Sequence, residues 1–361
     1  MNSSLLFWIS YDEMVYLKVF VGTIINPKLL KRAKSMSLKG KKVLVTGATG
    51  FLGSRLAEIL ADEEGATVTG IGRNLDRVAH LREKGINLVK ADLLNRDELK
   101  EAVSGQEIVF HSAASLDGNH ETGQKINVDA TKILVELSGE AGVSRFVHVS
   151  TVGVYDMPQT GAIDESFPLA INHSSMYART KARAENVVRK MAAKQKMEYA
   201  IIRPSMIYGP GHGVWTELMY KLILRGDPVY IGDGSTNYLP VYIDDVAQAL
   251  ILSSTSTDAP GEAYNISHEV TDWKTFMGHY AKIAGKETKG IPLFVARLMA
   301  WANKIPFITT PIDQGFVEMM NSTNTFPTGK AEQQLGWKPK VSLDEGLRRT
   351  TDWIKKELVT G

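Results

Sequence analysis

A glycine-rich turn sets the strongest constraint on how this chain can fold. An apolar run at residues 42–46 leads into Gly47-Ala48-Thr49-Gly50-Phe51-Leu52-Gly53, and an amphipathic segment follows. Glycines at this spacing permit a tight turn, a close approach of the backbone to a pyrophosphate, and packing of a helix on a strand. The start of that helix also offers unpaired N–H groups to an anion. The position of the triplet between a strand and a helix therefore predicts a nucleotide-binding turn.

The pattern after the turn predicts an α/β fold built on a doubly wound parallel sheet, because short β-type runs alternate with longer amphipathic segments. The expected strands are residues 42–46, 66–71, 87–90, 107–111, 145–150 and 198–203. The clearest helical patterns are residues 53–64, 128–140 and 176–193. We expect a nucleotide-binding domain at 40–205, joined again by 236–256, and a smaller C-terminal substrate-binding lobe made of 206–235 and 257–361.

Composition narrows the class of partner. The chain of 361 residues has 42 basic and 40 acidic residues spread along it, so we expect no nucleic-acid partner. It has no cysteine, which excludes disulfides, thiolate nucleophiles and cysteine-ligated metal. This fits a reducing compartment, and we expect a cytoplasmic protein. We expect no metal site, since His111 and His148 have no second ligand at metal spacing.

Residues 1–39 differ from the rest of the chain. Their two apolar stretches, 5–9 and 14–25, are too short or too interrupted by charge for a transmembrane span, and no positive charge precedes the first as a secretory signal would require. We expect a poorly ordered extension, with Met36 as a candidate natural start. A basic stretch at 28–42 leaves weak peripheral membrane contact as the alternative.

The end of the second expected strand bears on the choice of dinucleotide. Folds that prefer NAD place a carboxylate there for the ribose 2′-hydroxyl. This chain has Gly70-Ile71-Gly72-Arg73-Asn74, and Arg73 could pair with the 2′-phosphate of NADP. We therefore expect NADP(H) rather than NAD(H), although Arg73 could also be a solvated loop residue. Asp92 and Leu93 are placed to contact the adenine, unless Asp92 only caps the next helix.

A tyrosine and a lysine four residues apart offer acid/base chemistry. Tyr177 and Lys181 share one face of the helix expected at 176–193. The ammonium is expected to favour the phenolate and to lower the tyrosine pKa. The strand at 145–150 delivers Ser150 and Thr151 to the carboxyl edge of the sheet, where ligands bind in open α/β folds. One of the two hydroxyls is expected to polarise the substrate oxygen.

These motifs together resemble the extended short-chain dehydrogenase/reductases, in particular the NAD-dependent epimerase/dehydratase family and its 3β-hydroxysteroid dehydrogenase-like and dihydroflavonol reductase-like branches. The resemblance covers nearly everything from Lys42 onward and implies a Rossmann-type fold. It implies that Tyr177 is the acid/base, that Lys181 is its partner and binds the nicotinamide ribose, and that Thr151 is the hydroxyl. Ser150 is the alternative to Thr151.

Further segments carry the same resemblance, at 111–114, 203–210, 243–247 and 335–339. Asn127 matches a helix start that is implied to support a water-linked proton relay, and otherwise it caps that helix. Ala130 departs from the usual glycine. A homodimer through the helices bearing Asn127 and Tyr177 is implied by analogy. The expected cofactor-binding residues are Gly47, Thr49, Gly50, Phe51, Leu52, Gly53, Arg73, Asp92, Leu93, Ala113, Ala114, Tyr177, Lys181 and Pro204.

Differences at a few positions favour one reaction within this group. Related dehydratases carry Asp-Glu after the catalytic threonine, whereas this chain has Val152-Gly153. Nucleotide-sugar epimerases carry an asparagine and an arginine for the substrate, which are replaced here by Met206 and by the segment 238–240. Apolar runs at 291–294 and 298–301 suggest an apolar pocket, or the core of a small helix.

The sequence therefore predicts an NADP(H)-linked oxidoreductase that interconverts a ketone and a secondary alcohol on a relatively apolar small molecule. Two alternatives stay open. The first is a nucleotide-sugar epimerase of the same family. The second is a dinucleotide-binding sensor without turnover, which the Thr151, Tyr177 and Lys181 set argues against, because a pure binder gains little from a poised phenol.

Overall fold

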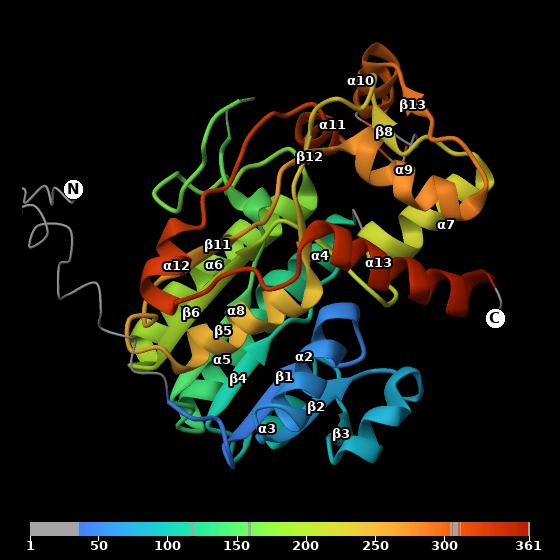
Figure 1. Ribbon diagram of the computed structural model, residues 1–361. Helices are drawn as coiled ribbons and strands as arrows, with labels where there is room; N and C mark the ends of the chain where they lie inside the picture. Colours follow the sequence, from blue (N-terminus) through green and yellow to red (C-terminus); the bar gives the residue numbers. More distant parts are fainter. Residues whose placement is uncertain are drawn as a thin grey trace, which may run out of the picture.

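The computed structural model describes residues 36–116, 119–157, 160–303, 305, 310 and 312–359. A parallel sheet of seven strands forms its centre (Figure 1). The strand order is β11 (Ala263–Ile266), β6 (Glu198–Pro204), β5 (Arg145–Val149), β4 (Ile108–His111), β1 (Lys42–Thr46), β2 (Thr67–Gly72) and β3 (Asn87–Lys90). The predicted doubly wound, Rossmann-type α/β fold is confirmed.

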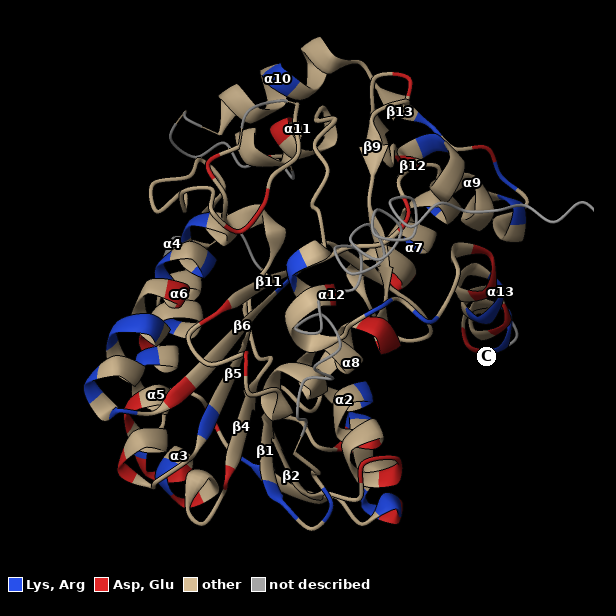
Figure 2. Cartoon of the chain, turned by 60° about the vertical axis from the view of Figure 1, so that its left-hand side comes forward, with Lys and Arg blue, Asp and Glu red and all other residues tan. Residues whose placement is uncertain are grey.

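Helices cover both faces of this sheet (Figure 2). One layer contains α2 (Phe51–Asp62), α8 (Ile243–Thr255) and α12 (Gly329–Leu335), and the other contains α3 (Arg96–Val103), α5 (Ala130–Glu140) and α6 (Met176–Gln195). The alternation of side chains along a strand explains the two layers. In β1, Val43 and Val45 pack in the core cluster beneath α2, while Leu44 packs in the cluster beneath α5. Strands buried on both faces are continuously apolar for this reason.

The sequence pattern located most of the sheet. The six expected strands all form, and their bounds differ from the expected ones by at most one residue at either end. The seventh strand, β11, was missed because its four residues, Ala-Tyr-Asn-Ile, contain a buried asparagine and are too short to stand out. β11 pairs with β6 in the central sheet, although 257–361 was expected to belong wholly to the second lobe. The boundary is corrected for these residues.

Short elements between and after these strands build the second lobe. Three two-stranded pairs contribute: β7 (Met206–Tyr208) with β10 (Pro240–Tyr242), β9 (Asn237–Tyr238) with β12 (Thr271–Asp272), and β8 (Tyr230–Ile231) with β13 (Gly290–Ile291). The helices are α7 (Met219–Arg225), α9 (Trp273–Ala284), α10 (Leu293–Ala302), α11 (Gln314–Met320) and α13 (Leu343–Ile354). Most of these elements gather at the upper right in Figure 1.

An aromatic cluster holds the second lobe together. The ring of Tyr238 lies 4.6 Å from that of Trp273 and 4.4 Å from that of Phe276, and all three side chains are fully buried. Aromatic pairs at such distances contribute about 0.5–1.5 kcal/mol beyond burial.

The expectations for residues 1–35 lie outside the described residues. None of the helices in the described part of the chain combines the length and the apolar composition needed to cross a membrane.

Candidate active site

The glycine turn has a backbone that side chains would block. Gly47 has φ +70°, and a Cβ there would lie 2.8 Å from the Cα of Ala113, in the segment after β4. A Cβ on Gly53 would collide with the carbonyl oxygen of Gly47. Helix α2 begins after Gly50, whose backbone is extended and which places no side chain on the first-turn amides. These amides are thus available to an anion, as the motif predicts.

Neighbouring segments fix the other residues of the turn. Atoms added at Gly211 and Gly213 would lie 2.8 Å from the ring of Phe51, so the loop that follows β7 packs against this ring. An atom added at Gly72 would meet the side chain of Thr49 in the same way. Thr49 therefore lies at the end of β2, next to Arg73, which is exposed.

The segment after β3 contains Asp92 and Leu93, and the structure decides one of the two roles considered for Asp92. Asp92 is half-buried, and its carboxylate accepts a hydrogen bond from the amide of Leu94, while its own amide donates to Glu98. The cap of α3 is Asn95, whose side chain accepts from the amides of residues 97 and 98. The alternative that Asp92 caps this helix is therefore wrong. Its neighbour Leu93 is half-buried.

Helix α6 carries the half-buried Tyr177 in its first turn and brings Lys181, one turn later, to the end of β5. Lys181 is 3% exposed, and its Nζ donates to the carbonyl oxygen of Val149 at 2.5 Å. Burial lowers the pKa of Lys181 from its usual 10.5 to about 8, and burial raises the pKa of Tyr177 to about 12. The expected lowering of the tyrosine pKa is not found, because burial removes the solvent that would stabilise the charged phenolate. Tyr177 is therefore a protonated donor at neutral pH.

The two hydroxyls after β5 have different surroundings. Ser150 is 2% exposed, and its hydroxyl donates to the buried carboxylate of Glu185 at 2.6 Å. Thr151 is half-buried, and its hydroxyl accepts from the amide of Gly153 at 3.1 Å, which leaves its hydrogen available. This arrangement favours Thr151 over Ser150 as the group that meets a substrate.

Asn127 lies in a π-helical turn, Gln124–Asp129, that precedes α5. Its side chain accepts from the amide of Ser115 and donates to the carbonyl of Ser115 and to the hydroxyl of Thr180. Thr180 in turn donates to the carbonyl oxygen of Tyr177. Asn127 thus ties α6 to the segment after β4. The side-chain helix cap considered for it is not found, because its side-chain oxygen accepts from Ser115.

Two buried histidines lie under the site. The Nε2 of His111 faces Thr131, whose hydroxyl already donates to the carbonyl of Asn127, so this nitrogen must be the donor. The Nδ1 of His111 then accepts from Thr46 at 2.7 Å. Burial lowers the pKa of His111 to about 3 and that of His148 well below its usual value, so both rings are neutral. The described residues contain no cluster of three or more His, Asp or Glu side chains that could hold a metal ion.

A buried ion pair that sequence reasoning missed connects α6 to β6. Arg203 binds Glu185 through two hydrogen bonds, of 2.9 and 2.6 Å, and both side chains are at most 2% exposed. Arg203 also donates to the hydroxyl of Tyr155, which donates to Asn265 on β11. The available signal was the spacing of Glu185, which lies one helical turn after Lys181.

The segments 243–247 and 335–339, which carry part of the resemblance to the family, contact each other and not Tyr177 or Lys181. The indole of Trp337 donates to the carbonyl of Asp245 at 2.9 Å, and the Asp245 carboxylate accepts from the amides of Lys340 and Val341. These contacts fix the C-terminal segment on α8.

Pro204 is buried at the end of β6, and Ala113 is half-buried beside Gly47, while Ala114 is exposed.

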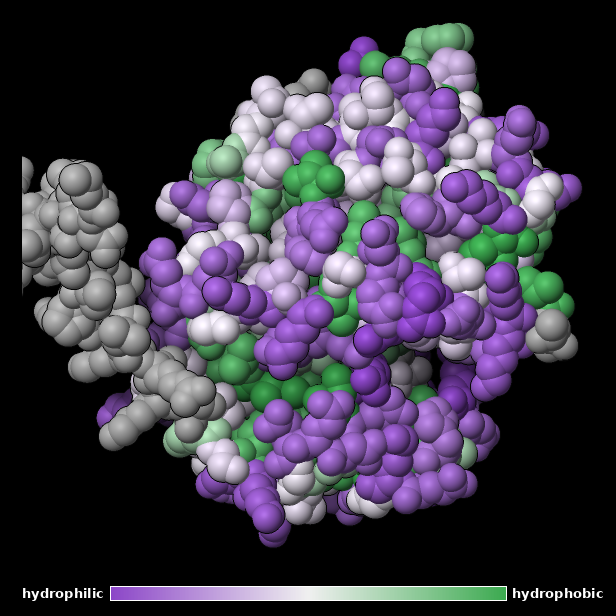
Figure 3. Space-filling view, in the orientation of Figure 1, coloured by the Kyte–Doolittle hydropathy of each residue, from purple (hydrophilic) through white to green (hydrophobic). Residues whose placement is uncertain are grey.

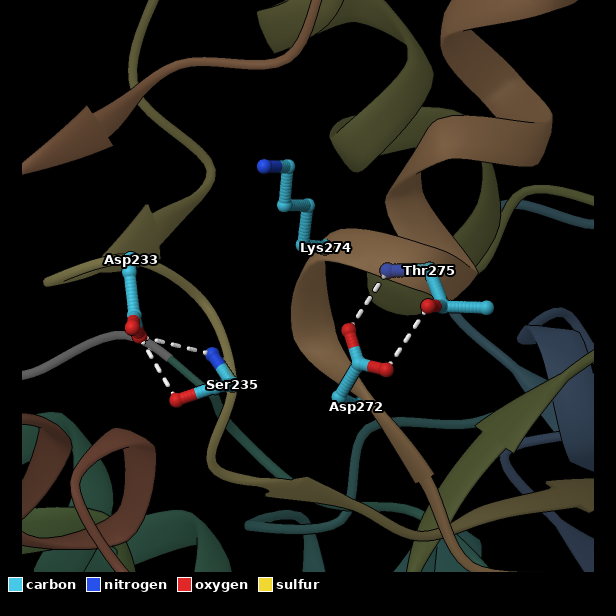
Figure 4. A pocket seen from close by; sticks show the side chains of 5 residues that line it. All are labelled: Asp233, Ser235, Asp272, Lys274 and Thr275. Carbon is cyan, nitrogen blue, oxygen red and sulfur yellow. Dashed lines mark hydrogen bonds between the residues drawn. The ribbon is translucent and has the colours of Figure 1, made fainter.

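A cavity of about 340 Å³ lies elsewhere, in the second lobe (Figure 4). Its carboxylates are occupied locally, because Asp233 accepts from Ser235 and Asp272 accepts from Thr275. The Lys274 side chain points away from both carboxylates. This cavity contains none of the expected catalytic residues.

Comparisons with known proteins bear on the family and the fold of this chain. A family model described as NAD dependent epimerase/dehydratase family matches residues 43–267. The chain is 30% identical over 352 residues to 3beta-hydroxysteroid-dehydrogenase/decarboxylase isoform 2 of Arabidopsis thaliana, with 86% of this chain and 61% of that protein covered. It is 28% identical over 327 residues to 2-alkyl-3-oxoalkanoate reductase of Stenotrophomonas maltophilia (strain K279a), with 85% and 98% covered.

A solved structure has the same fold. It is UDP-glucuronic acid 4-epimerase from Bacillus cereus in complex with NAD, with a TM-score of 0.70, 24% sequence identity, and 87% of this chain and 99% of that chain covered. The chain spans only about three fifths of the Arabidopsis protein, at 61% of its length. Since the family model matches more than half of the chain, the protein belongs to the NAD-dependent epimerase/dehydratase family.

Proposed function

We propose that the protein is an NADP(H)-linked oxidoreductase that interconverts a ketone and a secondary alcohol on a relatively apolar small molecule. One observation carries the proposal. Lys181, which follows Tyr177 by one turn of α6, reaches the carboxyl end of β5, where Thr151 comes next along the chain, and the glycine turn lies two strands away at the end of β1. Open α/β sheets bind dinucleotides at this edge.

Tyr177, Thr151 and Lys181 have separate roles in the proposed reduction. When bound, NADPH supplies the hydride that adds to the carbonyl carbon. Tyr177 donates its phenolic proton to the carbonyl oxygen, for which a raised pKa of about 12 keeps the proton in place at neutral pH. Thr151 donates a hydrogen bond to the same oxygen. Lys181 binds the nicotinamide ribose, and its charge stabilises the phenolate that remains.

The preference for NADP(H) rests on Arg73. The side chain is exposed at the end of β2, and the residues from 70 to 74 include no carboxylate that would bind a ribose 2′-hydroxyl. A guanidinium can bind the 2′-phosphate through two charge-assisted hydrogen bonds. The turn itself fits either dinucleotide.

Two kinds of observation support an apolar carbonyl substrate. The named relatives act, by their names, on a hydroxysteroid and on an alkyl oxoalkanoate. In this chain Met206 is 6% exposed, and Tyr238 is fully buried in the aromatic cluster, so neither position presents an exposed polar group to a sugar diphosphate. Two contacts that a nucleotide-sugar epimerase makes with its substrate are therefore missing at these positions, which disfavours the epimerase alternative.

We also propose a cytoplasmic homodimer, built through α5 and α6. This proposal rests on analogy with the family.

The test follows oxidation of NADPH and NADH across carbonyl compounds of graded size and polarity. We expect turnover with apolar ketones, and a higher kcat/KM with NADPH than with NADH. Turnover only of nucleotide sugars, without net change in the dinucleotide, would establish the epimerase. Tight NADPH binding with no turnover of any compound would establish the sensor.

A further inference from the structure

Glu185 and Arg203 form a charged pair in the interior of the protein. Hydrophilic residues make up much of the surface in Figure 3, whereas the side chains of Glu185 and Arg203 are 0% and 2% exposed. Burial of two charges costs free energy, and the replacement of a buried ion pair by apolar residues often costs no stability. Stability is therefore a weak reason for this pair, and its place in the fold points to another role.

Helix α6 contacts the end of β5 at two consecutive residues. Lys181 donates to the carbonyl oxygen of Val149 at 2.5 Å. One helical turn later, Glu185 accepts from the hydroxyl of Ser150 at 2.6 Å. Residues four apart share one face of a helix. The two contacts therefore bring the ammonium of Lys181 and the carboxylate of Glu185 to neighbouring points at the edge of the sheet that carries Thr151.

The surroundings of Glu185 favour the ionised carboxylate. Its Oε1 accepts from Ser150 and from Nε of Arg203, and its Oε2 accepts from Nη2 of Arg203 at 2.6 Å. Arg189, which is 33% exposed, lies 3.6 Å from the same Oε2. Donors and cations directed at both oxygens stabilise the charged form of a carboxyl. Glu185 thus holds a negative charge in a fixed place, one helical turn from Lys181.

The other groups that face Lys181 are uncharged at neutral pH. His111 on β4 and His148 on β5 lie close enough to feel its charge, and burial lowers the pKa of both rings far enough to keep them neutral. Tyr177 keeps its proton, because burial raises its pKa to about 12. Burial lowers the pKa of Lys181 to about 8, and the charge of Glu185 acts against this lowering.

We propose that Glu185 is a positioning residue that keeps the buried Lys181 charged. Its carboxylate, fixed by Arg203 and Ser150, balances the ammonium where solvent does not reach. The charge of Lys181 in turn stabilises the phenolate that remains on Tyr177 after proton transfer. The effect on turnover rests on the proposed function, whereas the effect on the charge of Lys181 does not.

The first measurement is kcat against pH with NADPH and an apolar ketone. In the wild type, kcat should fall as the pH rises past the Lys181 pKa of about 8. In Glu185→Gln, which keeps the size of the side chain, the fall should begin roughly one pH unit lower, because the ammonium loses its nearest opposite charge. Glu185→Asp keeps the charge and should restore the wild-type profile.

A matched control removes a carboxylate from another buried arginine. Glu198 accepts two hydrogen bonds from Arg145, of 3.1 and 2.6 Å, at the amino ends of β5 and β6. Lys181 lies at the carboxyl end of β5. Glu198→Gln therefore breaks a similar ion pair at the opposite edge of the sheet, and it should leave the pH profile unchanged.

The second measurement needs no substrate. The free energy of unfolding should rise with pH above the pKa of folded Lys181, since the unfolded chain then binds more protons. This rise should begin near pH 8 in the wild type and roughly one pH unit lower in Glu185→Gln. The double variant Glu185→Met, Arg203→Met leaves no lone buried charge, so it covers the case in which Glu185→Gln does not fold. It should shift the rise in the same direction.

Urea unfolding across pH 6 to 10 therefore separates this proposal from the proposed function. A rise that begins at the wild-type pH in Glu185→Gln and in the double variant would overturn the role of Glu185. So would an equal shift in Glu198→Gln. A shifted rise without turnover of any ketone would support the effect on Lys181 and contradict the proposed function.

Discussion

At the scale of single residues, Ser150 and Thr151 show how neighbours with the same functional group come to have different tasks. Ser150 is committed to the buried carboxylate of Glu185, whereas Thr151 keeps a free hydrogen at the edge of the sheet. The residues alone presented both hydroxyls, and only the family resemblance favoured Thr151 over Ser150. The choice depends on Glu185, which is 35 residues away and reaches Ser150 only through the fold.

Exchange of each hydroxyl tests this division. We expect Thr151→Ala to lower kcat about 100-fold, the typical loss of one hydrogen-bond donor to the reacting oxygen, with NADPH affinity unchanged. Ser150→Ala should keep most of the turnover but lower the free energy of unfolding by about 1–3 kcal/mol, because Glu185 loses a buried donor. Steady-state kinetics and urea unfolding measure the two effects. The opposite assignment of losses would make Ser150 the catalytic hydroxyl.

Arg73 carries the dinucleotide preference. Arg73→Ala should raise the KM for NADPH about 10- to 100-fold, since a charge-assisted contact contributes about 1.5–3 kcal/mol. The KM for NADH should stay within about 2-fold, because NADH has no 2′-phosphate to lose. Arg77→Ala, at another exposed arginine four residues later, is the matched control. An equal rise for both dinucleotides would contradict the role assigned to Arg73.

Lys181 gives a pH dependence whose sign follows from its burial. Its pKa is lowered from 10.5 to about 8, so between these values the unfolded chain binds more protons than the folded one. The free energy of unfolding should therefore rise with pH over this window. In Lys181→Met the rise should be smaller by about 3 kcal/mol. Urea unfolding of both proteins across this pH range measures the difference; parallel curves would show that the buried amine is not perturbed.

At the scale of elements, the glycine turn is the part that sequence predicted best, because its constraints are local.

Gly53→Ala should destabilise the protein and weaken NADPH binding, because the added Cβ meets the carbonyl of Gly47. Gly278→Ala is the control, since Gly278 lies inside α9 with no neighbouring atom within 4 Å of an added Cβ. It should stabilise by about 0.5–1 kcal/mol. Thermal unfolding and NADPH titration test both, and equal effects would refute the close packing of the turn.

Elements defined by periodicity were also predicted well, whereas irregular ones were not. The alternation and helical periods around β1 and α6 are repeated over enough residues to be read locally. The π-helical turn before α5 was not expected, because its extra residue per turn has no signature in hydrophobic spacing. β11 is recognisable only through its pairing with β6.

At the scale of the whole molecule, contacts between distant segments were beyond the reach of the sequence. Glu185 could be placed on the face of α6 that carries Lys181, but its partner Arg203 comes from the next strand. Trp337 reaches Asp245 across 92 residues. The apolar run at 298–301 was expected to line a pocket or fill the core of a small helix. Leu298 and Trp301 are instead exposed, because small alanines form the packed side of α10.

The central claim is that this fold brings Tyr177 to the carbonyl oxygen of an apolar ketone beside bound NADPH. The most direct measurement compares Tyr177→Phe with the wild type in NADPH oxidation with such a ketone and in NADPH binding. We predict unchanged NADPH affinity and a loss of turnover of at least about 100-fold, since the phenylalanine keeps the ring and removes the proton donor. Unchanged turnover in the variant would contradict the account.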